Sequence, residues 1–198
     1  MTAAQRAVYD AVVAGPRGAV VGPLLAVLHR PDLAGKWQEF GAMLRYGTSL
    51  PSRVNELAIL ATARHWNAQV EFYIHAQAAE KAGVGPSVIE AIRTGRRPAF
   101  SEPEEEEVYE FARQLLTTGQ VSDAVYARVR DRWQPVGVVE LTSVIGYYSM
   151  VAMTLNAHQI PLPDGAEPPL AFPAGGVPRA GGNGADGVTG LAVGDLND

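Results

Sequence analysis

Apolar side chains recur every three or four positions up to about residue 160, and Pro or Gly residues separate the resulting segments. This spacing matches the 3.6-residue turn of an α-helix, and no segment shows the alternation that is typical of a half-buried strand. We therefore expect an all-α fold in which Asn67 caps one helix and Gly83 ends it. The predicted helices lie near residues 2–14, 32–47, 51–66, 68–82, 86–94, 103–117, 122–132 and 136–157.

The composition predicts one globular domain over residues 1–160. The chain has 198 residues, of which 47% are hydrophobic and 19% charged, so it is long enough to bury one core. The net charge of -5 arises mostly from the C-terminal segment, which leaves the body close to neutral. Because no basic face is visible, nucleic acid is not an expected partner.

The expected location is the cytoplasm. The first residues contain Asp10 and no uninterrupted apolar stretch of the signal-peptide type. The absence of cysteine fits a reducing compartment. The most apolar stretch, residues 136–155, contains Glu140 together with hydroxyl and glycine positions, so it predicts a buried helix rather than a membrane span.

An acidic run, "EPEEEE" at residues 102–107, coincides with a predicted helix start. Negative charge is favourable there because it meets the positive end of the helix dipole. We interpret the run as a solvated helix N-terminus.

The chain changes character after residue 160. The last 38 residues contain 9 of the 21 glycines and 6 of the 14 prolines. Such a segment buries too little apolar surface to offset its chain entropy, so residues 161–186 are predicted to be a flexible linker.

Candidate acid–base residues cluster between residues 53 and 84. Glu71 and His75 are four positions apart on one predicted helix, where a carboxylate can orient an imidazole. Glu56 interrupts the apolar stripe of the preceding helix, and a hairpin about Asn67 would bring it near His75. Two carboxylates around a histidine suit general acid–base catalysis, although a Glu–His pair on a helix is also a common surface contact.

Other candidates are aromatic. His65 and Trp66, at the end of the helix near residues 51–66, are either packing residues or part of a pocket wall. Tyr147 lies on the last helix and is either a core residue or one whose hydroxyl reaches a pocket. The Glu-x-x-His pairs of di-iron bundles are missing, so no metal and no cofactor are expected.

The stretch "ELAILATARHWNAQVEFYIHAQAAEKAGV" resembles the carboxymuconolactone decarboxylase and alkylhydroperoxidase D superfamily, over roughly residues 20–160. That resemblance implies an alkylhydroperoxidase D-like helical bundle with a Glu, a Cys-x-x-Cys pair and a His. The matching positions here are Glu56, Ala68, Glu71 and His75. Thiol peroxidase chemistry requires cysteine, so the sequence excludes it.

What remains is similar to the decarboxylase branch of the superfamily, because "EFYIH" has an acidic residue, an aromatic residue and then the His. The resemblance implies Glu56, Glu71 and His75 as catalytic residues, a small organic acid or lactone as substrate, and a homotrimer or homohexamer. Two alternatives stay open: a non-catalytic cargo protein, and a peroxide-stress protein by family label only.

The last residues, 187–198, contain "LAVGDL", which resembles the targeting peptide of encapsulin cargo. Leu191, Val193, Gly194 and Leu196 fall on that pattern. The resemblance implies an encapsulin shell protein as partner and a location inside a nanocompartment. An uninformative terminus is the competing interpretation.

Overall fold

The computed structural model describes residues 1–20 and 22–171, and this part of the chain is all-α, as predicted. Short α2 is missing from the predicted set, because so few residues cannot show a helical period. The helices are α1 (Ala3–Ala14), α2 (Pro23–Val27), α3 (Pro31–Tyr46), α4 (Ser52–His65), α5 (Gln69–Lys81), α6 (Pro86–Arg93), α7 (Pro103–Thr118) and α8 (Asp123–Ala157).

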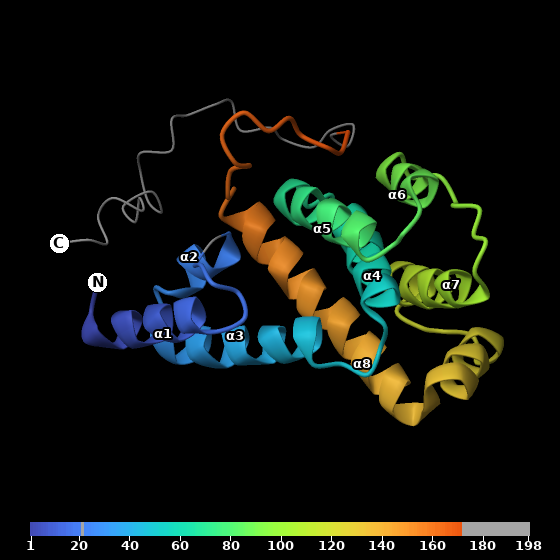
Figure 1. Cartoon of the computed structure of the whole chain (residues 1–198), viewed down its shortest axis with the longest axis horizontal. Coiled ribbons are helices and arrows are strands. Elements are labelled where there is room, and N and C mark those ends of the chain that lie inside the picture. Colours follow the sequence, from blue (N-terminus) through green and yellow to red (C-terminus); the bar gives the residue numbers. More distant parts are fainter. Residues whose placement is uncertain (21, 172–198) are drawn as a thin grey trace.

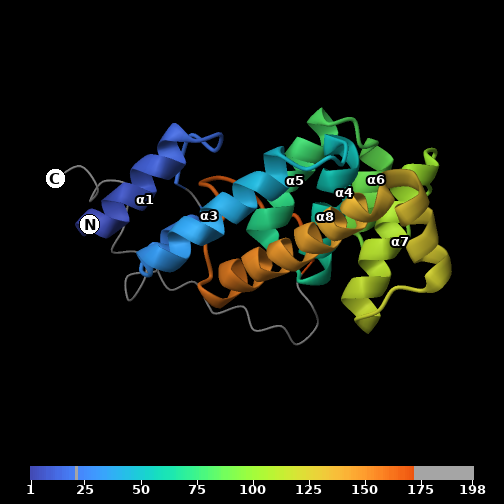
Figure 2. The same cartoon turned by 90° about the horizontal axis from the view of Figure 1, so that it is seen from below.

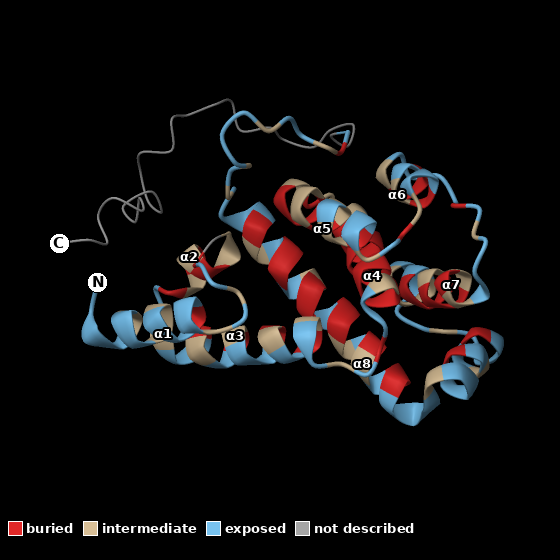
Figure 3. Cartoon of the chain, in the orientation of Figure 1, coloured by how far each residue is buried: buried red, intermediate tan, exposed pale blue. Residues whose placement is uncertain are grey.

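Helix α4 is the centre of the molecule. Every residue from Val54 to Ala63 is buried, and the helix packs against α5, α7 and α8 (Figure 1). Helices α1 and α3 lie at one end of the elongated molecule, and α6 and α7 lie at the other (Figure 2). Buried residues are concentrated on α4, on α5 and along one side of α8 (Figure 3). A functional site between these helices is therefore built on the most rigid part of the fold.

Two hydrophobic clusters flank α4. The larger one joins α3, α4, α7 and α8 through side chains such as Leu44, Ile59, Val108 and Leu141. The smaller one joins α4, α5 and α6 and includes Leu57, Phe72, Ile92 and Leu170. Since α4 contributes to both clusters, its two sides are covered by different sets of helices.

Helix α8 is bent where the sequence predicts a break between two helices. Gln134 has φ 61° and ψ 175°, and Pro135 follows it. Proline disfavours the helical conformation of the residue before it, which explains why the bend falls at Gln134. The bend is visible at the lower right of Figure 1.

By length and composition alone, α8 is apolar enough to cross a membrane. Half of its most apolar window is buried inside the fold, however, and the helix packs against α3, α4 and α7. These contacts agree with the prediction of a buried core helix over residues 136–155.

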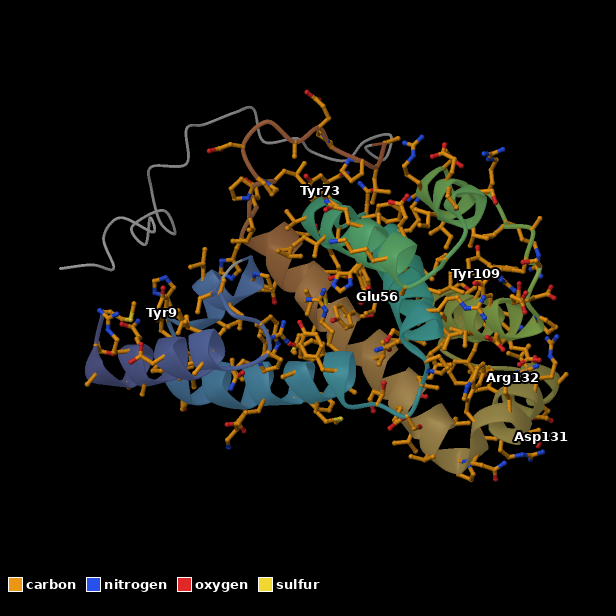
Figure 4. The ribbon with its side chains drawn as sticks, in the orientation of Figure 1. Tyr9, Glu56, Tyr73, Tyr109, Asp131 and Arg132 are labelled. Atoms are coloured by element: carbon orange, nitrogen blue, oxygen red, sulfur yellow. The ribbon has the colours of Figure 1, made fainter. Side chains whose placement is uncertain are left out.

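The acidic run is not a simple solvated helix start, so that interpretation is wrong. Pro103 begins α7 as expected, but Glu105, Glu107 and Glu110 are buried. A buried carboxylate needs a cationic or hydrogen-bonding partner. The ion pairs are Glu105–Arg53 at 3.3 Å, Glu107–Arg132 at 2.6 Å, Glu110–Arg113 at 2.9 Å, and a close Glu110–Arg97 contact. They fasten α7 to α4 and to the first part of α8, near the labelled Arg132 in Figure 4.

The segment predicted to be a linker from residue 161 onward is packed on the body over its first part. Leu170 is buried in the smaller cluster. The Gln69 side chain donates to the Leu170 carbonyl at 3.1 Å and accepts from the Leu170 N–H at 2.9 Å. Arg93 also donates to the Pro169 carbonyl at 3.0 Å. The chain is therefore held beside α5 and α6 as far as Leu170.

Candidate active site

The site begins with the turn between α4 and α5. Asn67 has φ 51°, in the left-handed region that asparagine tolerates better than most residues. The N–H of Ala68 donates to the carbonyl of Ala63 at 2.9 Å, which closes the turn. Ala68 is the N-cap of α5 and no side chain caps it, so the prediction that Asn67 caps this helix is wrong. The predicted hairpin itself is present.

This hairpin brings Glu56 of α4 to His75 of α5, as the sequence predicts. Glu56 Oε2 lies 2.6 Å from His75 Nδ1, and both side chains are buried. The other oxygen, Oε1, lies 3.9 Å from the guanidinium of Arg45 on α3. Glu56 is labelled in Figure 4, on the side of α4 that faces α8. Both of its oxygens thus have a cationic or hydrogen-bonding partner.

The surroundings of His75 favour a neutral imidazole. Burial lowers its pKa, and the hydrogen bond and charge of Glu56 oppose that shift without overcoming it. With Glu56 ionised, Nδ1–H donates to the carboxylate and Nε2 keeps its lone pair. Among the described residues, Nε2 has no hydrogen-bond partner. A base oriented in this way can accept a proton from a bound molecule.

Glu71 behaves differently from Glu56. It is buried, and neither carboxylate oxygen has a hydrogen-bond partner among the described residues. Burial raises its pKa well above the usual value and so favours the neutral carboxylic acid. Of the two carboxylates expected around His75, only Glu56 is hydrogen-bonded to it. Glu71 therefore does not orient the imidazole.

Glu71 and His75 open onto a cavity of about 120 Å³. The cavity lies between α3, α5 and α8 and is closed by residues of the α1–α2 connection and of α2. Most of its lining is apolar, from side chains such as Trp37, Ile74 and Val151. Its polar side chains are Arg17, Arg45, Tyr46, Glu71, His75, Tyr147 and Tyr148. An apolar pocket with a few convergent polar groups is the usual form of a small-molecule site.

Sequence reasoning missed the two arginines of this cavity. Arg17 lies in the connection between α1 and α2. Arg45 lies in the last turn of α3, where its favourable interaction with the helix dipole is already enough to explain a cation. Nothing in the local pattern around either residue indicates a pocket. Arg17 Nε and Nη2 are buried and have no hydrogen-bond partner among the described residues.

Tyr147 lines the cavity from α8, and Gly41 of α3 makes room for it. A Cβ atom at position 41 would lie 1.9 Å from the Tyr147 hydroxyl and 2.6 Å from Arg17 Nη2. Both groups therefore press against the backbone of α3, which fixes them next to each other. Burial raises the pKa of Tyr147 to about 12, despite the opposing effect of Arg17, so the hydroxyl keeps its proton. Tyr148 contacts the His75 ring edge-on at 5.0 Å.

His65 and Trp66 do not line the cavity, so their predicted role as a pocket wall is wrong. They lie at the end of α4, where their rings meet at 5.2 Å. His65 is exposed, and the Trp66 carbonyl accepts a hydrogen bond from Asn156 of α8 at 2.8 Å. The two residues belong to the packing of the hairpin turn.

The remaining site predictions concern metals and the shell-docking residues. Within residues 1–20 and 22–171, no three His, Asp or Glu side chains form a set able to hold a metal ion. Leu191, Val193, Gly194 and Leu196 lie outside the described residues.

The chain was compared with protein-family models and with curated proteins. No protein-family model matches the chain, and no curated protein matches it significantly. The geometry of the cavity and the residues of the sequence are therefore the basis for a functional assignment.

Proposed function

We propose that this protein is an enzyme that carries out acid–base chemistry on a small organic acid or lactone, with His75 as the base. The observation that carries the proposal is the 2.6 Å contact between Glu56 and His75 beside a cavity of about 120 Å³. Decarboxylation, isomerisation and proton transfer all belong to the chemistry that such a pair supports. Thiol peroxidase chemistry is excluded, because this chain has no cysteine.

In this proposal His75 Nε2 removes a proton from a substrate C–H or O–H group. The resulting imidazolium is stabilised by the Glu56 carboxylate through Nδ1–H, and the guanidinium of Arg45 lies 3.9 Å from the other oxygen of Glu56. The proton returns from Nε2 to another atom of the substrate, which completes an isomerisation or replaces a departing carboxyl group. The apolar walls exclude water and so strengthen these interactions.

Solvent-deuterium incorporation tests the proposal without advance knowledge of the product. The full chain is incubated in D₂O with small 3-oxo acids and unsaturated lactones, and NMR follows C–H exchange, CO₂ release and isomerisation. His75→Ala should reduce the rate about 10²- to 10⁴-fold, the usual contribution of a general base. His65→Ala is the matched control, since this histidine is exposed outside the cavity.

Equal rates in the His75→Ala variant and the unmodified protein would refute the assignment of His75. Absence of any exchange or turnover across both substrate classes would favour the alternative of a non-catalytic binding or structural cargo protein.

We further propose that the protein is cargo of an encapsulin shell and works in the cytoplasm inside that compartment. The support is the sequence pattern of Leu191, Val193, Gly194 and Leu196. Co-expression with a candidate shell protein, followed by quantification of co-purified cargo, is the test. Leu191→Ser together with Leu196→Ser should abolish loading, whereas Val177→Ser should not. Equal loading of all variants would contradict the docking role.

A homotrimer or homohexamer is proposed for the same protein. Large apolar side chains are exposed on two neighbouring helices, including Leu33 and Phe40 on α3 and Met150 and Met153 on α8. Contacts between Trp37 and Met150 hold these helices together. Burial of this surface in a closed oligomer removes it from water. A monomeric mass by light scattering would contradict this proposal.

A further inference from the structure

We propose that the cavity binds one small monocarboxylate, with Arg17 supplying the positive charge and the Glu71 hydroxyl supplying a hydrogen bond. This inference rests on the proposed function, because it names the charge and size of the molecule on which His75 acts. It concerns residues that lie outside the Glu56–His75 pair.

The charges that surround the cavity leave one cation without a counterion. Arg45 lies 3.9 Å from Glu56, so these two charges compensate each other. Burial favours the neutral forms of His75 and Glu71, because it lowers the pKa of the first and raises that of the second. Arg17 has no ion pair among the described residues, although its Nε and Nη2 atoms are buried. A bound monoanion makes the site electrically neutral, whereas a dianion leaves an excess negative charge in an apolar pocket.

Arg17 also has the right geometry for a carboxylate. A guanidinium presents parallel N–H groups that match the two oxygens of a carboxylate, and such pairs are stronger than neutral hydrogen bonds. The two partnerless atoms, Nε and Nη2, are one such edge of the Arg17 side chain. The contact of Nη2 with the backbone at Gly41 keeps this group at the cavity instead of in solvent.

Glu71 supplies the complementary donor. Both of its oxygens line a buried site without a partner, which costs stability unless a ligand satisfies them. As a neutral acid, the side chain has one O–H that donates to an anion and one oxygen that accepts. Its position one helical turn before His75 places the donor beside the base. A carboxylate held by Arg17 and Glu71 therefore presents the rest of the molecule to His75.

The volume limits the ligand to a few non-hydrogen atoms. A cavity of about 120 Å³ is somewhat smaller than an engineered protein cavity of about 150 Å³ that binds benzene, so a ligand of about five or six non-hydrogen atoms fits. Short-chain monocarboxylates fit this space. Their apolar chains also match walls made of side chains such as Ile74 and Val151.

The test is calorimetric titration of the full chain with propionate, and with propionamide, which has the same shape but no charge. Propionate should bind to one site per chain, and propionamide should bind at least about tenfold more weakly. Malonate, a dianion of similar length, should also bind more weakly than propionate. Equal affinity for propionate and propionamide would overturn the proposal without any variant.

Variants identify the groups that bind. Arg17→Gln should lose about tenfold or more in propionate affinity, and Glu71→Leu should weaken binding, while Glu71→Gln retains a donor and should stay within about threefold. Arg30→Gln is the control, because Arg30 is exposed and paired with Asp32. Unchanged affinity in folded Arg17→Gln would refute the role of Arg17, and circular dichroism checks the fold of each variant.

The pH dependence separates Glu71 from the other groups of the site. As pH rises, ionisation of Glu71 removes the donor and adds a negative charge, so propionate affinity should fall in the unmodified protein but not in Glu71→Gln. A decline of equal size in both proteins would contradict the proposal. The charged and titratable groups around the cavity are Arg17 of the α1–α2 connection, Arg45 and Tyr46 of α3, Glu56 of α4, His75 of α5, and Tyr147 and Tyr148 of α8. All of these groups are present in both proteins, so a difference between the two pH profiles belongs to Glu71.

Binding and catalysis fail separately in these experiments. Turnover without propionate binding would refute this inference and leave the proposed function standing. Propionate binding that depends on Arg17, in a protein that shows no turnover, would refute the proposed function alone. His75→Ala should still bind propionate within a few-fold of the unmodified protein.

Discussion

The acidic face of α7 and the cavity beside α5 both bury carboxylates, but the chain treats them in opposite ways. On α7, Glu105, Glu107 and Glu110 are each paired with at least one arginine. In the cavity, Glu71 and Arg17 are partly or wholly buried and have no ion-pair partner among the described residues. Both regions contain buried glutamates and nearby arginines, so residue composition does not distinguish them. They differ in whether the buried carboxylates have ion-pair and hydrogen-bond partners.

This difference has a physical cause. Burying a charge costs several kcal/mol unless a counterion and hydrogen bonds compensate it. On α7 the hydrogen bonds from Arg113 and Arg97 lower the pKa of Glu110, although burial acts in the other direction. At Glu71 burial acts alone and raises the pKa. Glu71 is thus the buried glutamate whose two carboxylate oxygens both lack a hydrogen-bond partner among the described residues.

The largest expected effect comes from breaking the α7 network. Arg53 of α4 contacts both Glu104 and Glu105, and the Glu105 side chain is buried. Arg53→Met leaves that carboxylate without its closest cation, so the free energy of unfolding should fall by about 2 to 3 kcal/mol. Urea unfolding followed by circular dichroism measures it. Arg30→Met, at an exposed pair, should leave the midpoint unchanged, and equal midpoints for both variants would show that the α7 pairs contribute nothing.

A second prediction compares one substitution at two equally buried glutamates. Glu71 is 2% exposed and Glu105 is 3% exposed. Glu71→Met removes unsatisfied polar atoms and should stabilise the protein by about 1 to 2 kcal/mol. Glu105→Met removes the partner of Arg53 and should destabilise it by about 1 kcal/mol. Thermal unfolding of both variants shows whether each substitution raises or lowers the stability. Destabilisation of equal size at both positions would contradict the proposed difference between the cavity and the α7 network.

The long helices, the α4–α5 hairpin and the bend in α8 can be predicted from the sequence. Helical periodicity and the Pro and Gly positions locate the long helices, because these signals are local. The pairing of Glu56 with His75 is also predictable, since a tight turn after α4 forces two consecutive helices into a hairpin. The bend at Gln134 follows from Pro135.

Other parts depend on tertiary packing and leave no local signal. Arg17 and Arg45 reach the cavity from a connection and from a helix end, and nothing in their neighbours indicates it. The acidic run looks solvated in sequence because its arginines come from α4, from α8 and from the segment before α7. His65 and Trp66 are also aromatic candidates in the sequence, but they lie at the end of α4 and do not line the cavity.

The smallest expected effect is a pH slope that belongs to Glu71. In the folded protein its raised pKa keeps the proton, whereas in the unfolded chain the group ionises near about pH 4.3. The folded state therefore binds more protons above that pH, and the stability of the protein decreases as pH rises until the folded pKa is passed. His75 acts in the opposite direction, because its lowered pKa costs stability as pH falls below about 6.5, but it does so equally in Glu71→Gln. The difference in unfolding free energy between the unmodified protein and Glu71→Gln, measured from about pH 5 to about pH 8, isolates the contribution of Glu71. A difference that does not change with pH would mean that Glu71 is ionised in the folded state, and would place it with the paired glutamates of α7.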